Sequence, residues 1–286
     1  MAITIATNIA SINAQRRLNQ SSGRLGQSFE RLSSGLRINR ASDDAAGLAV
    51  ADSLRADARI AGVAIRNAND GISTIAIADS ALNEIGNVLT RMAELSEQSA
   101  NGVLTTTQRS ALANEFTALG SEIERIAFTT NFNGVNLISS GSNIVFQVGF
   151  DSASTSQITL NNVRGTLAAL GLAGSNSSSL TYSINGATVA DAQSAARNAL
   201  DAVKNAITSL TSTRGVLGAA GSRLNVAISN LSVARENFLA AESRIRDVDV
   251  ASEAAELTRL TILQQAGAAV LAQANQQPQL ALSLLR

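Results

Sequence analysis

Apolar residues recur along this chain at steps of three and four positions, the spacing of a helix that buries one face. The first such stripe consists of Leu18, Leu25, Phe29, Leu32 and Leu36. A second stripe runs from Ala51 through Ile75 to Leu89. It predicts a single helix from about residue 44 to 100, roughly 85 Å long at about 1.5 Å per residue.

The centre of the chain changes character. Turn-forming residues Asn101-Gly102 end the long helix, and a third stripe from Leu112 to Ile126 predicts a helix that folds back antiparallel to it. Between 130 and 190 Gly, Ser, Asn and Thr dominate. Runs rich in β-forming residues at 143–150 and 156–160 predict a small hairpin. We expect a Ser-rich loop around 174–179 and a second hairpin through 182–189 to follow.

Helical periodicity returns after Ala190 and continues to the C-terminus. We expect the last helix to cover about 250 to 276 and to end at Pro278, because proline has no backbone N–H to donate. The predicted fold class is therefore mainly α. A long antiparallel helical rod or coiled coil is formed by the N- and C-terminal segments, and a small central region contains a β-hairpin.

Apolar seams of this length have two interpretations. A self-contained helical bundle or a spectrin-like spacer would bury them within one chain. Alternatively, terminal segments with long apolar stripes and few charges become ordered when copies pack together, and a repeated contact between different faces of identical subunits gives an open helical filament. Periodicity alone leaves both interpretations open.

The chain contains neither Cys nor His. This composition excludes thiol nucleophiles, disulfides, His-ligated metal sites and the Ser-His-Asp triad. Catalysis would need a carboxylate pair or a hydroxyl nucleophile without its usual base. We therefore expect no enzyme, and with it no catalytic residues, metal or cofactor.

Charge gives few further indications of a partner. The 22 basic and 22 acidic residues balance, so no strong field favours nucleic acid. Arginines concentrate in residues 1–40, but the apolar periodicity continues past them, unlike in a transit peptide. The start also lacks the basic leader and apolar run of a secretory signal, and no segment is apolar over about eighteen residues, so we expect no membrane insertion.

Three separated motifs carry a resemblance to a known family. They are LSSGLRIN and ASDDAAGLA at 32–39 and 41–49, TNFNGV at 130–135, and ILQQAG through LAQANQ at 262–276, with LSLLR at the end. In this order they resemble the signatures of bacterial flagellin, over about residues 1–140 and 195–286. The resemblance implies a structural subunit that polymerises into the bacterial flagellar filament for swimming motility, here in a short form with reduced or absent outer domains.

The family resemblance also implies five segments. Residues 1–42 and 245–286 are the N- and C-terminal inner-core arms, 43–140 and 191–244 are the two parts of a helical rod domain, and 141–190 is a short central region of strands and loops. In flagellins the arms are disordered in the monomer and form a coiled coil after assembly. The apolar residues expected to drive inner-core assembly are Ile5, Ile9, Ile12, Leu18, Leu25, Leu257, Leu260, Leu263, Val270 and Leu271.

A spoke between arm and rod is expected at Ser33, Ser34, Gly35, Ser42 and Asp43. Glycine allows backbone freedom there, and Ser42 or Asp43 is expected to cap the long helix. A simple turn between helices is the alternative reading of each residue taken singly.

Flagellins are also ligands of the flagellin-sensing Toll-like receptor, and the matching positions here are Arg91, Leu95 and Glu115. Ala93 departs from the pattern, because receptor-active members usually have a second Arg there. The alternative for these positions is a helix surface that faces solvent or another subunit. The Ser and Thr residues between 139 and 195 are either acceptors of O-linked sugars or parts of a polar loop.

The resemblance places the protein outside the cell, in the flagellum, after export as an unfolded chain without a cleaved signal peptide. Its implied partners are further copies of itself, an export chaperone, the cap and hook-filament junction proteins, and the receptor. A hook-filament junction protein is the main alternative identity, although the C-terminal and TNFNGV motifs favour flagellin. An enzyme is a more distant alternative, in the form of a flagellin with a metalloprotease insert in its middle, but such an insert would need histidines that the chain lacks. A soluble helical spacer remains the third alternative.

Overall fold

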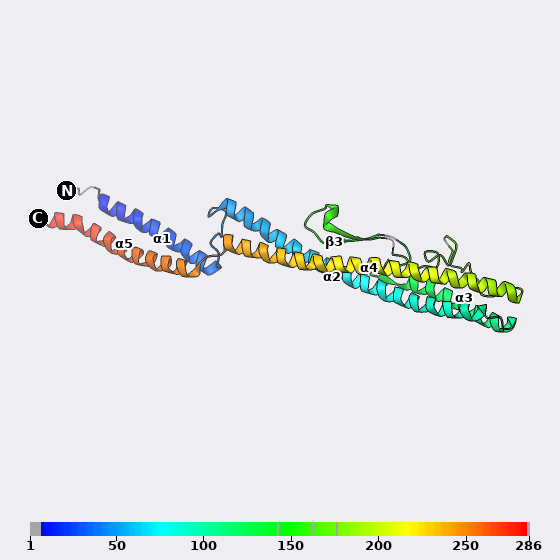
Figure 1. Cartoon of the computed structure of the whole chain (residues 1–286). Coiled ribbons are helices and arrows are strands. Elements are labelled where there is room, and N and C mark those ends of the chain that lie inside the picture. The colour runs from blue at the N-terminus through cyan, green and yellow to red at the C-terminus, as the bar shows by residue number, and fades with distance from the viewer. Residues whose placement is uncertain (1–6, 142, 162, 176, 285–286) are drawn as a thin grey trace. The chain divides into compact units, whose positions relative to one another are not determined.

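The computed structural model describes residues 7–284 except 142, 162 and 176, with the backbone alone from 277 onward. Within this part of the chain the main elements are five helices and two short hairpins (Figure 1). The helices are α1 (Ile9–Ser34), α2 (Ala45–Ala100), α3 (Thr106–Thr129), α4 (Val189–Arg246) and α5 (Val250–Leu284). The strands are β1 (Asn131–Phe132), β2 (Val135–Asn136), β3 (Ile144–Gln147) and β4 (Gln157–Leu160), with a 3-10 helix at Ser154–Ser156. The mainly α prediction is confirmed.

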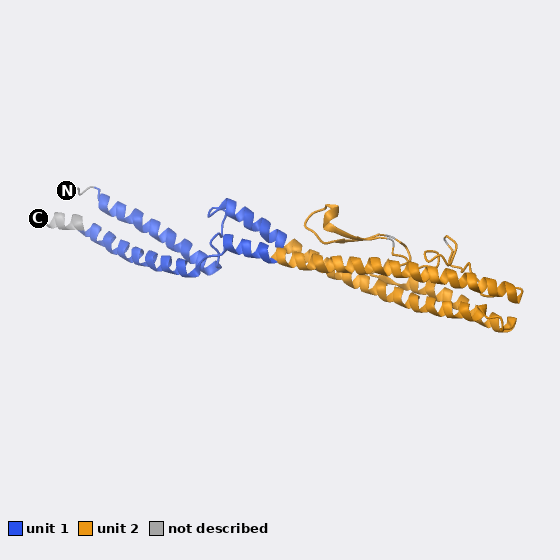
Figure 2. Cartoon of the chain, in the orientation of Figure 1, with its two compact units in different colours: residues 1–58, 236–286 blue, residues 59–235 orange. Residues whose placement is uncertain are grey.

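The chain forms two compact units (Figure 2). Unit 1 contains residues 1–58 and 236–286, and unit 2 contains residues 59–235. The five-segment division expected from the sequence concerns function, and it stays a prediction.

Unit 1 contains the antiparallel pair α1 and α5. At one end Asn8 Nδ2 donates to the Ala274 carbonyl across 2.8 Å, and near the other Arg31 and Glu253 approach to 4.0 Å. Few side chains along this pair are buried: Leu260, Ala274 and Ser28. Two helices alone cannot enclose a wide apolar stripe, so much of the stripe stays at the surface.

Unit 2 is built from α3 and the adjoining parts of α2 and α4, which lie side by side (Figure 1). Arg91 of α2 pairs with Glu115 of α3, so α3 runs antiparallel to α2 as predicted. Arg214 of α4 binds Asp79 of α2 across 2.7 Å. The centre of this bundle is filled by Leu82, Ile85, Leu89 and Met92 from α2, Phe116 and Ile123 from α3, and Val203, Leu210, Leu217 and Leu224 from α4.

The predicted hairpin is present as the antiparallel pair β3–β4, with Ile144 opposite Leu160. The prediction of a second hairpin through 182–189 is wrong. There, the Ile184 side chain is fully buried and its carbonyl accepts a hydrogen bond from Ser99 Oγ across 2.6 Å, so this segment packs as a loop. A short hairpin that the sequence analysis did not predict forms between β1 and β2, at the TNFNGV motif.

The C-terminal helix also differs from expectation. Backbone helix continues through Pro278 to Leu284, so the prediction that proline ends α5 is wrong. Proline removes one N–H donor from a helix interior, which disfavours the helix without forbidding it. The surrounding Gln, Leu and Ala residues have high helix propensity and favour continuation.

Candidate functional site

The α1–α5 pair presents large apolar side chains to solvent. Ile9 and Ile12 of α1 are 63% and 57% exposed, and Ile262 and Val270 of α5 are 60% and 59% exposed. Several large apolar side chains exposed along one helix pair indicate a surface for protein interaction.

The residues predicted for inner-core assembly have different environments in the structure. Leu260 is buried; Leu18, Leu25, Leu257 and Leu271 are half-buried. Ile9, Ile12, Leu263 and Val270 are exposed, and Ile5 lies outside the described residues. The set therefore includes residues that join α1 to α5 and residues that remain available to another molecule.

A groove of about 420 Å³ runs between α1 and α5, with Leu18, Leu263 and Val270 in its lining and Arg17 and Arg24 also along it. Beyond Arg259 the sequence has no charged residue until Arg286. The α5 side chains that line the groove are therefore uncharged and can be buried without desolvating a charge of their own, and the charges along the groove belong to α1. No helix in the described part of the chain is long and apolar enough to cross a membrane.

The expected spoke residues surround a crossing of two backbone segments in unit 1. Gly35 ends α1 in the left-handed conformation, with φ of 72°, which glycine adopts without steric cost. Its carbonyl accepts a hydrogen bond from Val248 N across 3.0 Å, and Arg37 N donates to the Arg246 carbonyl across 2.6 Å. Ser34 Oγ accepts from Leu36 N across 3.2 Å, whereas Ser33 is exposed.

Asp43 holds the loop that follows this crossing. Its carboxylate accepts hydrogen bonds from Arg40 N at 3.0 Å, from Asn39 N at 3.1 Å and from Gln27 Nε2 at 3.1 Å. These donors, the Arg40 amide first, lower the pKa of Asp43 because they favour the charged form.

The prediction that Ser42 or Asp43 caps the long helix is wrong. Helix α2 begins at Ala45, and Asp44 Oδ1 accepts a hydrogen bond from Gly47 N across 2.9 Å. This is the N-cap geometry, in which the side chain reaches the third amide of the helix. The carboxylate of Asp43 is already used by the preceding loop.

The predicted receptor-recognition residues are brought together only in part. Arg91 Nε donates to Glu115 across 2.9 Å and Nη1 donates to Glu94 across 3.0 Å, in an exposed cluster on α2 and α3. The hydrogen bond to Glu115 is the largest cause that raises the pKa of Arg91. Leu95 is fully buried, so in this structure its side chain is not available to a partner.

Sequence reasoning missed Arg109, which is fully buried in the first turn of α3. Its guanidinium donates to the carbonyl oxygens of Ser99, Asn101 and Leu104, at the end of α2 and in the turn that follows. A cation is favourable at a helix C-terminus, where carbonyl groups lack helical partners. No sequence pattern distinguishes this arginine from the exposed ones.

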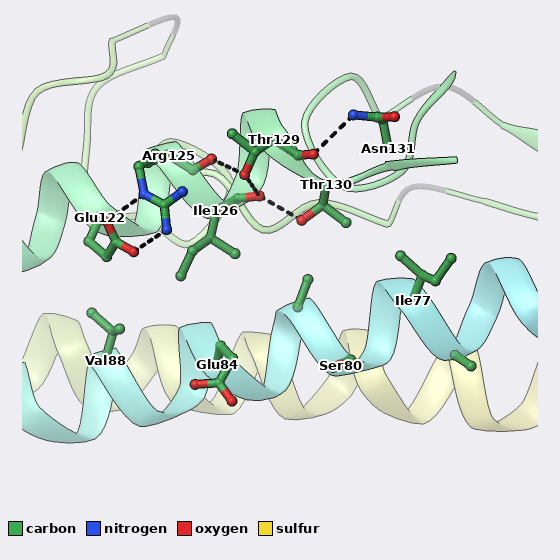
Figure 3. Close-up of a pocket in the computed structure, with 12 residues that line it drawn as sticks. Ile77, Ser80, Glu84, Val88, Glu122, Arg125, Ile126, Thr129, Thr130 and Asn131 are labelled. Carbon is green, nitrogen blue, oxygen red and sulfur yellow. Dashed lines mark hydrogen bonds and ion pairs between the residues drawn. The ribbon is translucent and has the colours of Figure 1, made fainter. Parts of the chain in front are cut away.

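An open groove of about 750 Å³ lies between α2 and α3 in unit 2. Figure 3 shows Ile77, Glu84 and Val88 of α2 on one side of it and Glu122 and Arg125 of α3 on the other. Arg125 is paired with Glu122. In the described part of the chain, acidic residues nowhere form a group of three or more that could hold a metal ion.

Comparisons with known proteins agree with this architecture. Residues 5–143 match the bacterial flagellin N-terminal helical region, and residues 200–285 match the bacterial flagellin C-terminal helical region. The chain is 42% identical to a flagellin of Halalkalibacterium halodurans over 279 residues, which are 98% of each protein.

Two further relatives match parts of the chain. Polar flagellin F of Vibrio parahaemolyticus is 48% identical over 165 residues, 57% of this chain and 44% of that protein, so the match spans less than half of the Vibrio protein. The crystal structure of Bacillus cereus flagellin covers 58% of this chain and 88% of its own, with 26% identity and a TM-score of 0.48. With both terminal regions matched and a full-length relative at 42% identity, the chain belongs to the bacterial flagellin family, whose members are structural subunits of the flagellar filament and not enzymes.

Proposed function

We propose that this flagellin assembles through the α1–α5 pair, whose exposed apolar residues are buried between copies in the filament. The observation that carries the proposal is the exposure of Ile9, Ile12, Ile262 and Val270 after α1 and α5 have paired. A monomer that had satisfied its apolar seams would hide these side chains. The residues of segments 1–42 and 245–286 thus act as inner-core arms.

The free-energy balance favours an α1–α5 pair that becomes fully ordered only when copies assemble. Ordering each residue costs about 1–2 kcal/mol, whereas buried apolar area returns about 25 cal/mol per Å². A two-helix pair with so few buried side chains recovers little of this cost alone. Packing against further copies buries the exposed stripe and supplies the remainder, as in other segments that fold on binding.

Seeded assembly tests the proposal. The purified chain is added to short filament fragments and viewed by negative-stain electron microscopy, beside a version that lacks residues 260–286. We expect long filaments from the intact chain and soluble protein from the shortened one. An intact chain that stays monomeric under all assembly conditions contradicts the proposal and favours the helical spacer, and growth limited to a few layers favours the junction protein.

We also propose export as an unfolded chain without a cleaved signal peptide, with an export chaperone, the cap and the hook-filament junction proteins as partners. The flagellin motifs support this proposal, and the chain contains no Cys whose disulfides would obstruct passage. The mass of the protein recovered from filaments tests whether a signal peptide is removed. A product shortened at its N-terminus by the length of a signal peptide contradicts the proposal of export without cleavage.

We infer a second role as ligand of the flagellin-sensing Toll-like receptor, supported by the exposed Arg91–Glu115 pair on α2 and α3. Arg91→Ala should lower activation of receptor-expressing reporter cells, because a partly exposed guanidinium forms strong charge-assisted contacts. Arg125→Ala, which removes another exposed α3 ion pair, is the matched control. Equal activity of both variants and the unsubstituted chain contradicts the inference.

A further inference from the structure

Three Asn–Gly steps occur in this sequence, and the structure gives each a different geometry. Asn101–Gly102 follows α2, Asn133–Gly134 forms the turn between β1 and β2, and Asn185–Gly186 precedes α4. An asparagine before glycine can lose its side-chain amide without an enzyme, because glycine has no side chain to shield its backbone nitrogen. The rate depends on how closely that nitrogen approaches Cγ of the asparagine.

Asn185 already has the two reacting groups together. The backbone N–H of Gly186 donates to Oδ1 of Asn185 across 3.0 Å, so the nitrogen and the side-chain carbonyl lie on the same side of the residue. The leaving nitrogen, Nδ2, donates to Ser110 Oγ across 3.3 Å. Asn185 N also donates to Ser183 Oγ across 3.2 Å, which holds the segment in this arrangement.

The other two steps hold the same groups in less reactive arrangements. Asn133 and Gly134 have φ of 50° and 79°, the conformation of a type I′ turn. Such a turn sets ψ of its first central residue near about +30°, which points the next nitrogen away from Cβ. At Asn101 the side-chain oxygen accepts from Val103 N across 3.3 Å, beyond Gly102, and Arg109 Nη2 donates to the Asn101 backbone carbonyl across 2.7 Å.

We propose that Asn185 is a site of spontaneous deamidation, and that in the folded chain it reacts ahead of Asn101 and Asn133. The Gly186 nitrogen loses its proton to solvent base and attacks Cγ of Asn185. The new N–Cγ bond forms as the Cγ–Nδ2 bond breaks, and Nδ2 takes a proton and leaves as ammonia. Water then opens the cyclic imide at either carbonyl to give aspartate or isoaspartate. The net reaction consumes one water, releases ammonia and involves no oxidation.

The products alter the packing before α4. A carboxylate at position 185 can no longer donate to Ser110, and it adds a negative charge one residue before Gly186, which packs against Asp191. Isoaspartate also lengthens the backbone by one methylene. The backbone at the neighbouring Gly186 is closely packed, because a Cβ there would lie 2.5 Å from Ala192 N. We therefore expect isoaspartate to loosen the loop whose Ile184 side chain is buried in the bundle.

The experiment measures deamidation at each of the three Asn–Gly pairs on a separate tryptic peptide. Cleavage at the arginines gives 92–109, 126–164 and 165–197, each with one Asn–Gly step. The full chain, native and unfolded in urea, is incubated at neutral and mildly alkaline pH. Mass spectrometry measures the amide-to-acid conversion, and an isoaspartyl methyltransferase labels the rearranged product. Asn185→Gln is the test variant, since glutamine would have to form a larger ring; Asn133→Gln is its matched control.

In the native chain we expect conversion to accumulate first in 165–197, to rise with pH, and to disappear in Asn185→Gln but not in Asn133→Gln. Unfolding should remove the order of reactivity, because each step then samples the same conformations. The proposal is overturned if 92–109 or 126–164 converts first in the native chain, or if the native order persists in urea.

Discussion

Truncating two exposed side chains of α5 tests the assembly surface most directly. Leu263 and Val270 are 43% and 59% exposed, so about half of each is available to another copy. The double change Leu263→Ala with Val270→Ala removes five carbon groups, each worth about 0.8 kcal/mol when fully buried. With about half of that area buried only on assembly, the loss is about 2 kcal/mol per subunit. Because about 1.4 kcal/mol corresponds to a tenfold change, the critical concentration should rise about thirtyfold.

Sedimentation of seeded filaments measures this quantity, since the protein left in the supernatant at equilibrium is the critical concentration. Val103→Ala is the matched control, because Val103 is 81% exposed in the turn after α2 and lies in unit 2. Far-UV circular dichroism of the monomers checks that helix content is kept. If the double variant has the critical concentration of the unsubstituted chain with its helix content intact, the exposed face of α5 is not buried between copies and the reasoning fails.

Three further predictions concern stability, each measured by urea unfolding. Arg109→Met should lower the unfolding free energy by about 2–4 kcal/mol, because it leaves buried carbonyl groups unpaired. The control Arg125→Met removes an exposed ion pair and should cost less than about 1 kcal/mol. Equal losses for the two variants would contradict the role of the buried guanidinium. The pKa of Asp43 in the folded chain lies below its ordinary value of 3.8, so the ionised carboxylate stabilises the fold. This stabilisation is fully present above pH 3.8 and is lost as the pH falls through the lower folded pKa. Asp43→Asn should therefore flatten the acid side of the stability curve, and an unchanged curve refutes this. Gly120→Ala should destabilise the fold by about 1–3 kcal/mol, because its Cβ would meet a neighbouring side chain at 2.4 Å. Gly215→Ala should stabilise it by about 0.5–1 kcal/mol, because the space around Gly215 is open. Changes of the same sign in the two unfolding free energies would contradict this reasoning.

Periodicity predicted the helices well because their buried faces are long and regular. The stripe from Ala51 to Leu89 places α2 within a residue of its observed start, and the turn at Asn101-Gly102 marks its end. The β3–β4 hairpin was also predictable, since its strands combine β-forming residues with flanking turns.

What the sequence could not predict depends on contacts between distant segments. The loop at 182–189 has the composition of a hairpin, but burial of Ile184 and its bond to Ser99 determine its course. Arg109 is indistinguishable from a surface arginine until the turn after α2 folds around it. The predicted N-cap of α2 was wrong because the adjacent residues Asp43 and Asp44 have the same capping propensity. The folded loop binds the Asp43 carboxylate and leaves that of Asp44 to cap the helix.

The crossing in unit 1, where Gly35 and Arg37 bond to Val248 and Arg246, is made largely of main-chain groups. Main-chain bonds do not depend on side-chain identity, so most point substitutions at the crossing should leave it intact. Insertions, deletions and proline act differently, because they shift or remove the bonding amides themselves. The length of these two segments, more than their composition, is therefore the property that selection has to preserve.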